Sequence, residues 1–235
     1  MIGKVFLGLI IILMTAFSAY SQQFAPESDF RVQVIPGTNT IEIHRYVGSS
    51  REVRIPPQIQ NMPVAVIGGG AFSDSQLTAV VIPDTVTRIG NSAFNGNQLS
   101  TVVIPNSVTS IGTFSFANNQ LTSVTISNSI SRIENGAFSE NRLSTITIPS
   151  SVTQIGASAF NGNQLVNVTI PAGVTHIGNL AFSNNQLTSI NIPVTVTNIG
   201  NSAFLGNELT SVTIPNRETV IGSRVFDTGV TVIRN

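Results

Sequence analysis

The sequence predicts a mainly β solenoid of about eight coils, each 22 residues long. The first observation is that phenylalanine recurs eight times at a fixed interval of 22 residues. The second is that each unit contains the pattern Leu-x-x-Val-x-Ile, whose alternation of β-branched residues is typical of a strand. The third is that the segments between these patterns are rich in Gly, Asn and Pro and are too short for long helices. The repeated phenylalanines are Phe72, Phe94, Phe116, Phe138, Phe160, Phe182, Phe204 and Phe226.

The first half of each unit predicts a strand that is buried on one face. In one unit, Leu99, Val102 and Ile104 are expected to point inward, while Thr101 and Val103 point outward. A proline directly follows most of these strands and ends them, because proline has no N–H to donate to a ladder.

The second half predicts a shorter strand on the opposite wall. Residues 108–111 alternate again, and Gly112 permits a turn after them. The Ala-Phe pair that follows in most units leaves room for at most one helical turn, since Gly and Asn flank it. One coil is therefore expected to consist of a strand, a corner, a short strand, a tight turn and a second corner.

Such a coil cannot bury its apolar side alone, but stacked copies can. We expect the phenylalanine rings to form one continuous stack. An asparagine precedes each repeated leucine by two positions, and its amide can satisfy corner backbone groups that no strand pairs. A buried asparagine ladder is the preferred interpretation, and a polar binding row is the alternative. The asparagines are Asn97, Asn119, Asn141, Asn163, Asn185 and Asn207.

The N-terminal residues predict export and a cap. Lys4 precedes an apolar run over residues 5–17, and small residues at Ala19 and Ser21 fit a peptidase site, so residues 1–21 are predicted to be a signal peptide. An uncleaved anchor is the alternative, and no membrane insertion is expected after cleavage. Residues 22–54 are expected to form a loose linker followed by a capping hairpin, and residues 55–235 the solenoid.

Composition argues against several classes of function. Only 9% of residues are charged, and no basic cluster of the kind that binds nucleic acid is present. The sequence has no cysteine and two histidines, and its acidic residues are scattered singly. Glu134 and Glu140 offer only a thin basis for a carboxylate pair. We therefore expect no catalytic residues, no metal site and no cofactor, and no enzyme activity.

The repeat resembles a known family. The strand pattern, the asparagine column and the string IPNSVTSIG at residues 104–112 are similar to treponeme-type leucine-rich repeats of BspA-like bacterial surface proteins. The resemblance covers residues 54–232 and includes the entry segment IPPQIQNMPVAVIGGGAF at residues 55–72. It implies a right-handed leucine-rich-repeat solenoid, export, and a general tendency towards adhesion. Many relatives carry cysteine where this sequence has asparagine, and relatives are often longer.

The expected binding surface is the outward face of the longer strands. The leading hypothesis is recognition of an extracellular or host protein or glycan, by a bacterial protein that is secreted, periplasmic or on the outer cell surface. The alternatives are a passive structural component of the envelope and, last, an ice-binding protein. A further interpretation is that Ser and Thr simply suit exposed strand positions. The predicted contact residues are Thr101, Val103, Ser123, Thr125, Thr145, Thr147, Asn167, Thr169, Ser189, Asn191, Ser211 and Thr213.

Overall fold

A computed structural model describes residues 23–234 of the chain. The predicted signal peptide, residues 1–21, lies outside this range. Within it, no helix combines the length and the apolar character needed to cross a membrane.

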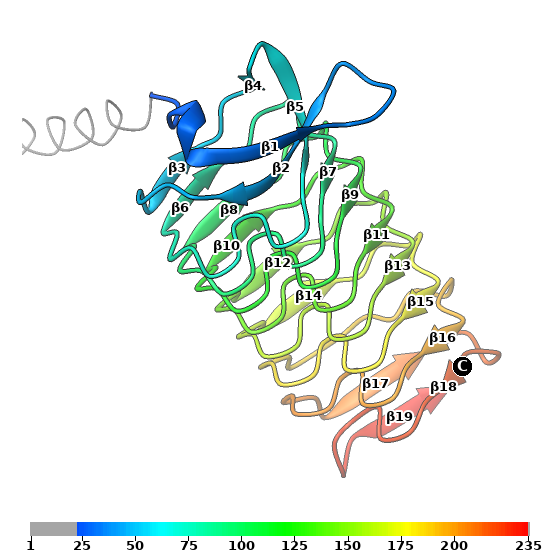
Figure 1. Ribbon diagram of the computed structural model, residues 1–235. Coiled ribbons are helices and arrows are strands. Elements are labelled where there is room, and N and C mark those ends of the chain that lie inside the picture. The colour runs from blue at the N-terminus through cyan, green and yellow to red at the C-terminus, as the bar shows by residue number, and fades with distance from the viewer. Residues whose placement is uncertain (1–22, 235) are drawn as a thin grey trace, which may run out of the picture.

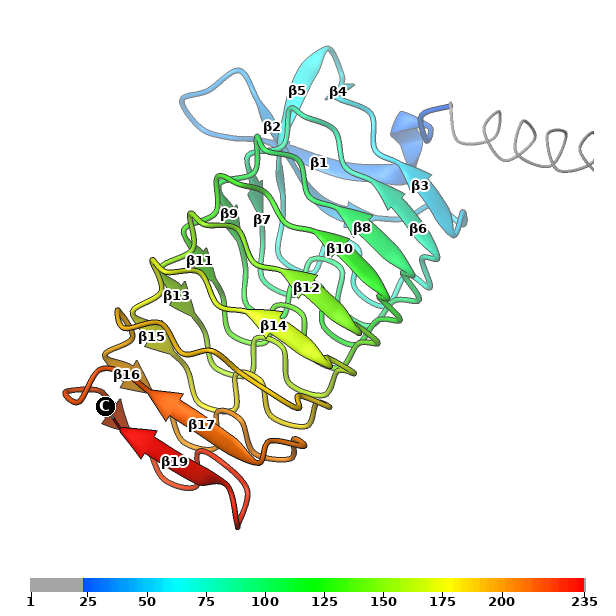
Figure 2. The ribbon, with the colours of Figure 1, turned by 180° about the vertical axis from the view of Figure 1, so that it is seen from behind.

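The chain winds into a solenoid whose coils stack along one axis (Figure 1). Most strands in the coils run parallel to their partners one coil away. The mainly β repeat architecture predicted from the sequence is therefore confirmed. Two walls of strands enclose the core, and we call them the long-strand wall and the short-strand wall (Figure 2).

The long-strand wall contains the Val-x-Ile segments of the repeat. Its strands are β3 (Glu52–Arg54), β6 (Ala79–Val81), β8 (Thr101–Val103), β10 (Ser123–Thr125), β12 (Thr145–Thr147), β14 (Asn167–Thr169), β17 (Ser211–Ile214) and β19 (Thr231–Arg234).

The short-strand wall lies on the opposite side and consists mostly of two-residue strands. They are β5 (Met62–Ile67), β7 (Arg88–Ile89), β9 (Ser110–Ile111), β11 (Arg132–Ile133), β13 (Gln154–Ile155), β15 (His176–Ile177), β16 (Asn198–Ile199) and β18 (Val220–Ile221).

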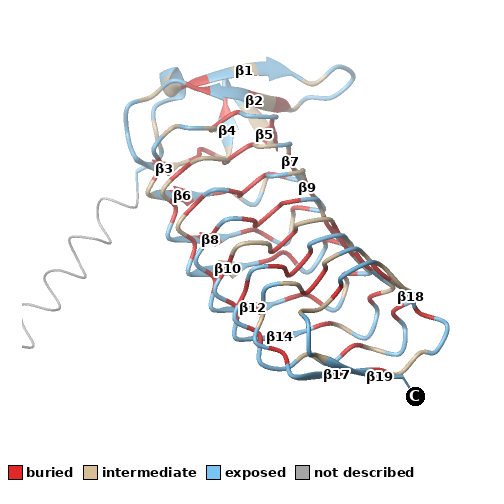
Figure 3. Cartoon of the chain, turned by 90° about the horizontal axis from the view of Figure 1, so that it is seen from below, coloured by how far each residue is buried: buried red, intermediate tan, exposed pale blue. Residues whose placement is uncertain are grey.

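The core between the walls is a stack of aromatic rings surrounded by aliphatic side chains. Neighbouring rings from Phe72 to Phe226 lie 5.0–5.7 Å apart between centroids, with interplanar angles of 5–18°. The rings from Phe72 to Phe204 are fully buried, whereas Phe226 is half-buried. Buried residues follow the inside of every coil in Figure 3. The predicted continuous stack is confirmed.

The segment before each phenylalanine contains hydrogen-bonded turns and no helix. In one coil the N–H of Ala93 donates to the carbonyl of Gly90 at 3.3 Å, and the N–H of Asn95 donates to the carbonyl of Ser92 at 3.2 Å. Ser92 has φ of +55°, which interrupts any right-handed helix. Among residues 23–234 the one helix is a single 3₁₀ turn, η1 (Glu27–Asp29).

The asparagine column is bonded to the backbone of two coils, and all of its members are buried except the half-buried Asn207. Asn97 Nδ2 donates to the carbonyls of Phe72 at 2.8 Å and Phe94 at 3.0 Å, and its Oδ1 accepts the N–H of Leu77 at 2.9 Å. Asn119, Asn141, Asn163, Asn185 and Asn207 make the equivalent bonds in the coils that follow. The predicted ladder is confirmed, because these corner groups have no strand partner of their own.

A hairpin covers the first coil, as expected. Strands β1 (Phe30–Val34) and β2 (Ile41–Tyr46) pair antiparallel, and Tyr46 stacks on Phe72 with centroids 5.3 Å apart. Tyr46 thus extends the ring stack by one step. Burial raises the pKa of the Tyr46 phenol, and the nearby Asp29 carboxylate raises it further.

The segment preceding the hairpin is docked on the solenoid, whereas a loose linker was expected. The N–H of Ala25 donates to the Arg54 carbonyl at 2.9 Å, and Glu27 Oε2 accepts the N–H of Gln60 at 3.0 Å. These bonds join residues far apart in the sequence, which is why local composition did not indicate them.

The first coil also contains β4 (Gln58–Ile59), which pairs antiparallel with β5.

One substitution coincides with a break in the short-strand wall. Strands β1, β2, β5, β7 and β9 form one continuous ladder, and β11, β13, β15, β16 and β18 form another. The coil that follows the break carries Glu134 where the other coils carry glycine. A Cβ at the equivalent Gly156 would lie 2.7 Å from the backbone nitrogen of Asn135 in the preceding coil. We infer that the Cβ of Glu134 holds its coil away from the coil before it.

We expect Phe160→Ala to lower the free energy of unfolding by about 3–5 kcal/mol, because it leaves a cavity inside the ring stack. Chemical denaturation measures the loss. Phe226→Ala removes a half-buried terminal ring and serves as the matched control, with a smaller loss. Equal losses from the two variants would contradict a continuous core.

We expect Glu134→Gly to let β9 and β11 pair and to slow amide hydrogen exchange at residues 131–133. The reciprocal change, Gly156→Glu, should open the ladder between β11 and β13, accelerate exchange there and lower the melting temperature. Exchange rates that stay the same in both variants would show that this column does not control the ladder.

Candidate binding surface

The structure brings all twelve predicted contact residues to the surface of the long-strand wall. In β8, Thr101 and Val103 are exposed and Val102 between them is buried. The same alternation recurs in β12 and β14, because successive side chains of a strand point to opposite faces. Ser123, Thr125, Ser189, Asn191, Ser211 and Thr213 are exposed as well.

The backbone beneath these residues is less continuous than the sequence pattern implies. The strands pair in twos, as β3–β6, β8–β10, β12–β14 and β17–β19. Ser189 lies outside any strand, and Asn191 makes only an isolated parallel bridge with Thr169. The twelve side chains therefore share one face, while the hydrogen-bonded ladder below them is interrupted.

The face is uncharged over most of its length. Residues 143–207 contain no Asp, Glu, Lys or Arg, so the coils from β12 to Asn191 present hydroxyl and amide groups. An apolar edge lies towards the N-terminal end, where Val81 is 47% and Val103 is 63% exposed. Removing charged groups from water is the most costly step in burying polar surface. A partner that covers this face would have to desolvate few charges.

The sequence interpretation missed how the face continues at both ends. Glu52 and Arg54 of β3 are in register with Ala79 and Val81, so the two outward files begin with opposite charges. At the far end, β19 extends the files beside β17. The Glu-Val-Arg alternation was visible in the sequence, but it was assigned to the cap.

The short-strand wall has a different chemistry. Its outward column contains Arg88, Ser110, Arg132, Gln154, His176 and Asn198, which pair in register within each of its two ladders. Beside this column, Thr109 Oγ1 donates to the Thr87 carbonyl at 3.3 Å, and the equivalent hydroxyls of later coils donate in the same way. His176 is exposed to solvent.

No arrangement typical of catalysis or metal binding appears in the part of the chain that the structure describes. Within residues 23–234 no group of three or more His, Cys, Asp or Glu could hold a metal ion. Glu134 forms an ion pair with Arg132, with Nε and Oε1 3.3 Å apart, and Glu140 accepts a hydrogen bond from Asn161 at 3.0 Å. The two carboxylates therefore have separate partners.

The repeat identifies the family. The BspA type leucine rich repeat region matches residues 65–188 and 131–232, in six copies. The chain belongs to this family, and its repeats are of a kind that is generally non-catalytic. A comparison with curated proteins gives no match.

Solved structures of similar shape are bacterial repeat proteins. A leucine rich cell surface protein from Faecalibacterium prausnitzii is 26% identical, with a TM-score of 0.71 over 91% of this chain and 76% of that one. A leucine-rich repeat protein from Bacteroides ovatus is 22% identical, with a TM-score of 0.60 over 91% and 71% of the two chains. The T. pallidum leucine rich repeat protein is 24% identical, with a TM-score of 0.52 over 89% and 86%. The last two support the fold alone.

Proposed function

We propose that the protein is an exported, non-enzymatic binding module, adhesin-like in character, whose long-strand wall contacts an extracellular protein or glycan. The observation that supports this most directly is the contrast between the two walls. Between its charged ends, the long-strand wall offers an extended, uncharged set of hydroxyl and amide groups, whereas the short-strand wall carries arginines and an ion pair within its ladders.

The geometry of a solenoid favours such a role. Each coil adds a copy of the same outward positions, so the binding surface grows with the number of repeats without any change to the core. Hydroxyl and amide groups can donate and accept hydrogen bonds, which suits either a polypeptide backbone or sugar hydroxyls. The apolar edge at Val81 and Val103 supplies area that is favourable to bury.

Export and a surface location are supported by two observations. Residues 1–21 have the pattern of a signal peptide, with Lys4 ahead of an apolar run. The Faecalibacterium prausnitzii relative is described as a cell surface protein. The proposed compartment is the outside of a bacterial cell, either attached or released.

The replacement Thr125→Lys, Thr147→Lys, Thr169→Lys tests the wall directly. All three positions are exposed, so we expect the fold to persist, with each change costing less than about 0.5 kcal/mol. Binding of the purified protein to immobilised extracellular matrix or to bacterial cells should fall at least about tenfold, because a partner would have to desolvate three ammonium groups.

The matched control places the same charge on the other wall, as Ser110→Lys, His176→Lys, Asn198→Lys. This variant should bind like the wild type. Binding that survives the first triple variant, or is lost equally in both, would exclude the long-strand wall. A passive envelope component would bind in neither assay, and thermal hysteresis in a cooling assay would instead support ice binding.

A further inference from the structure

The repeat provides an internal reference against which unusual residues stand out. One column occupies the turn before the buried phenylalanine, and it holds serine in three coils. Its residues take left-handed backbone angles, with φ of +51° to +61°. Phe114 is the one aromatic residue in this column. The column consists of Ser92, Phe114, Gly136, Ser158, Leu180, Ser202 and Arg224.

Phe114 contributes little to the stability of the fold at this position. A left-handed φ of +55° in a bulky residue costs roughly 1–2 kcal/mol relative to ordinary backbone. The side chain is 46% exposed, so one part of an apolar ring faces water. Another part covers Gly136, which is buried, and the ring occupies the space that a Cβ at Gly136 would need.

The second unusual residue lies beside the first. The N–H of Phe114 donates to the carbonyl of Asn135 at 2.9 Å, and Asn135 directly follows Glu134. The Cα atoms of Glu134 and Gly136 are at most about 7 Å apart, because they are two residues apart in the chain. The Phe114 ring therefore packs on a residue that lies two positions after Glu134 in the adjoining coil.

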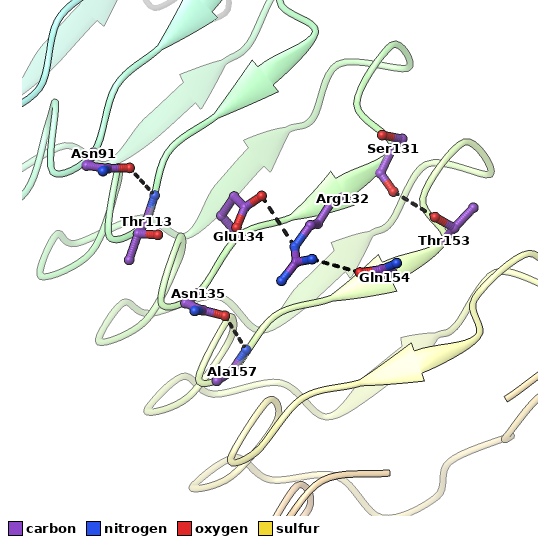
Figure 4. A network of polar contacts seen from close by, with 9 residues as sticks. All are labelled: Asn91, Thr113, Ser131, Arg132, Glu134, Asn135, Thr153, Gln154 and Ala157. Carbon is purple, nitrogen blue, oxygen red and sulfur yellow. Dashed lines mark hydrogen bonds and ion pairs between the residues drawn. The ribbon is translucent and has the colours of Figure 1, made fainter. Parts of the chain in front are cut away.

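Figure 4 shows the polar contacts that Arg132, Glu134 and Asn135 make at this edge of the wall. Arg132 pairs with Glu134 at 3.3 Å and donates from Nη1 to Gln154 Oε1 at 2.7 Å. Asn135 Oδ1 accepts the N–H of Ala157 at 2.8 Å, which leaves its Nδ2 without a partner among residues 23–234. The side chains of Arg132 and Glu134 remain 47% and 33% exposed.

From this arrangement we propose a carbohydrate subsite in which the Phe114 ring is the platform for a neutral pyranose and Glu134, Arg132 and Asn135 bind its hydroxyls. The electron-rich face of an aromatic ring attracts the C–H groups of a sugar ring. Carboxylate oxygens accept from hydroxyls, while guanidinium and amide N–H groups donate to them. Because the Arg132–Glu134 pair is neutral overall, the site suits a hexose or N-acetylhexosamine and not an acidic sugar.

The subsite is distinct from the long-strand wall and does not depend on it. It also accounts for two departures from the repeat that each disturb the structure locally. A strained, exposed ring packs two residues away from a glutamate that coincides with a break in a strand ladder, as expected where stability is given up for a function.

The test uses substitutions that restore the repeat. Phe114→Ser installs the commonest residue of its column, and Glu134→Gly installs the residue that every other coil carries at that position, so both variants should fold and melt no lower than the wild type. Leu180→Ser is the matched control, because Leu180 lies in the same column with φ of +56° and is exposed, but the next coil carries Gly200 where the proposed site has Glu134.

The probe is a printed array of neutral, N-acetylated and acidic oligosaccharides, followed by titration of the full chain with the best neutral sugar on the array. We expect the wild type and Leu180→Ser to bind it alike, and Phe114→Ser and Glu134→Gly each to lose at least about tenfold in affinity. The proposal is overturned if the wild type binds no neutral sugar, or if Phe114→Ser binds as well as the wild type. The lysine variants of the long-strand wall should retain this binding, which separates the two proposals.

Discussion

The stacking of each coil on the next is the interaction on which the rest of the structure depends. A single coil exposes both faces of its phenylalanine ring and leaves corner N–H and C=O groups without strand partners. The neighbouring coil covers the ring at 5.0–5.7 Å, and the asparagine amide joins the backbone of two coils. The same contact between coils buries the ring and supplies hydrogen-bond partners for the corner backbone groups. One coil alone can do neither.

Stacking of the coils constrains the core positions and leaves the residues on the outer surface free to vary. Core positions are fixed by burial, whereas outward positions of the strands have no partner within the coil and can carry any residue that tolerates a strand. The two walls use this freedom differently. One is almost uncharged, and the other carries arginines, a histidine and an ion pair. The proposed binding surface and the proposed sugar subsite lie on opposite walls for this reason.

Much of this structure could be predicted from the sequence because one local pattern recurs in every unit, so the structure of one coil and its repeat length determine the fold of the whole. The 22-residue spacing of phenylalanine predicted the ring stack, and the asparagine two positions before each repeated leucine predicted the buried ladder. The alternation in Thr101-Val102-Val103 gave the exposed face. The interruptions of the ladders were not predicted, since they depend on how closely neighbouring coils approach each other. The docking of Ala25 and Glu27 was also missed, because their bonds join segments that share no pattern.

The candidate site was predictable only in part. Exposure of its twelve residues follows from strand periodicity, but the outward continuation through Glu52 and Arg54 became visible only from the register of β3 with β6. Phe114 was hidden in the sequence by its neighbour Phe116, which belongs to the buried column. Its backbone angle and its contact with Gly136 distinguish it.

Deletion of whole and half units tests most directly whether coils are stable only on copies of themselves. Removing residues 143–164 takes out one complete unit and joins Arg142 to Leu165 in the correct phase. We predict a folded protein that unfolds cooperatively, with a smaller denaturant m-value because less surface is buried. Removing residues 143–153 shifts every later strand to the wrong wall and should abolish cooperative folding. Loss of folding in both deletions, or its survival in both, would contradict the account.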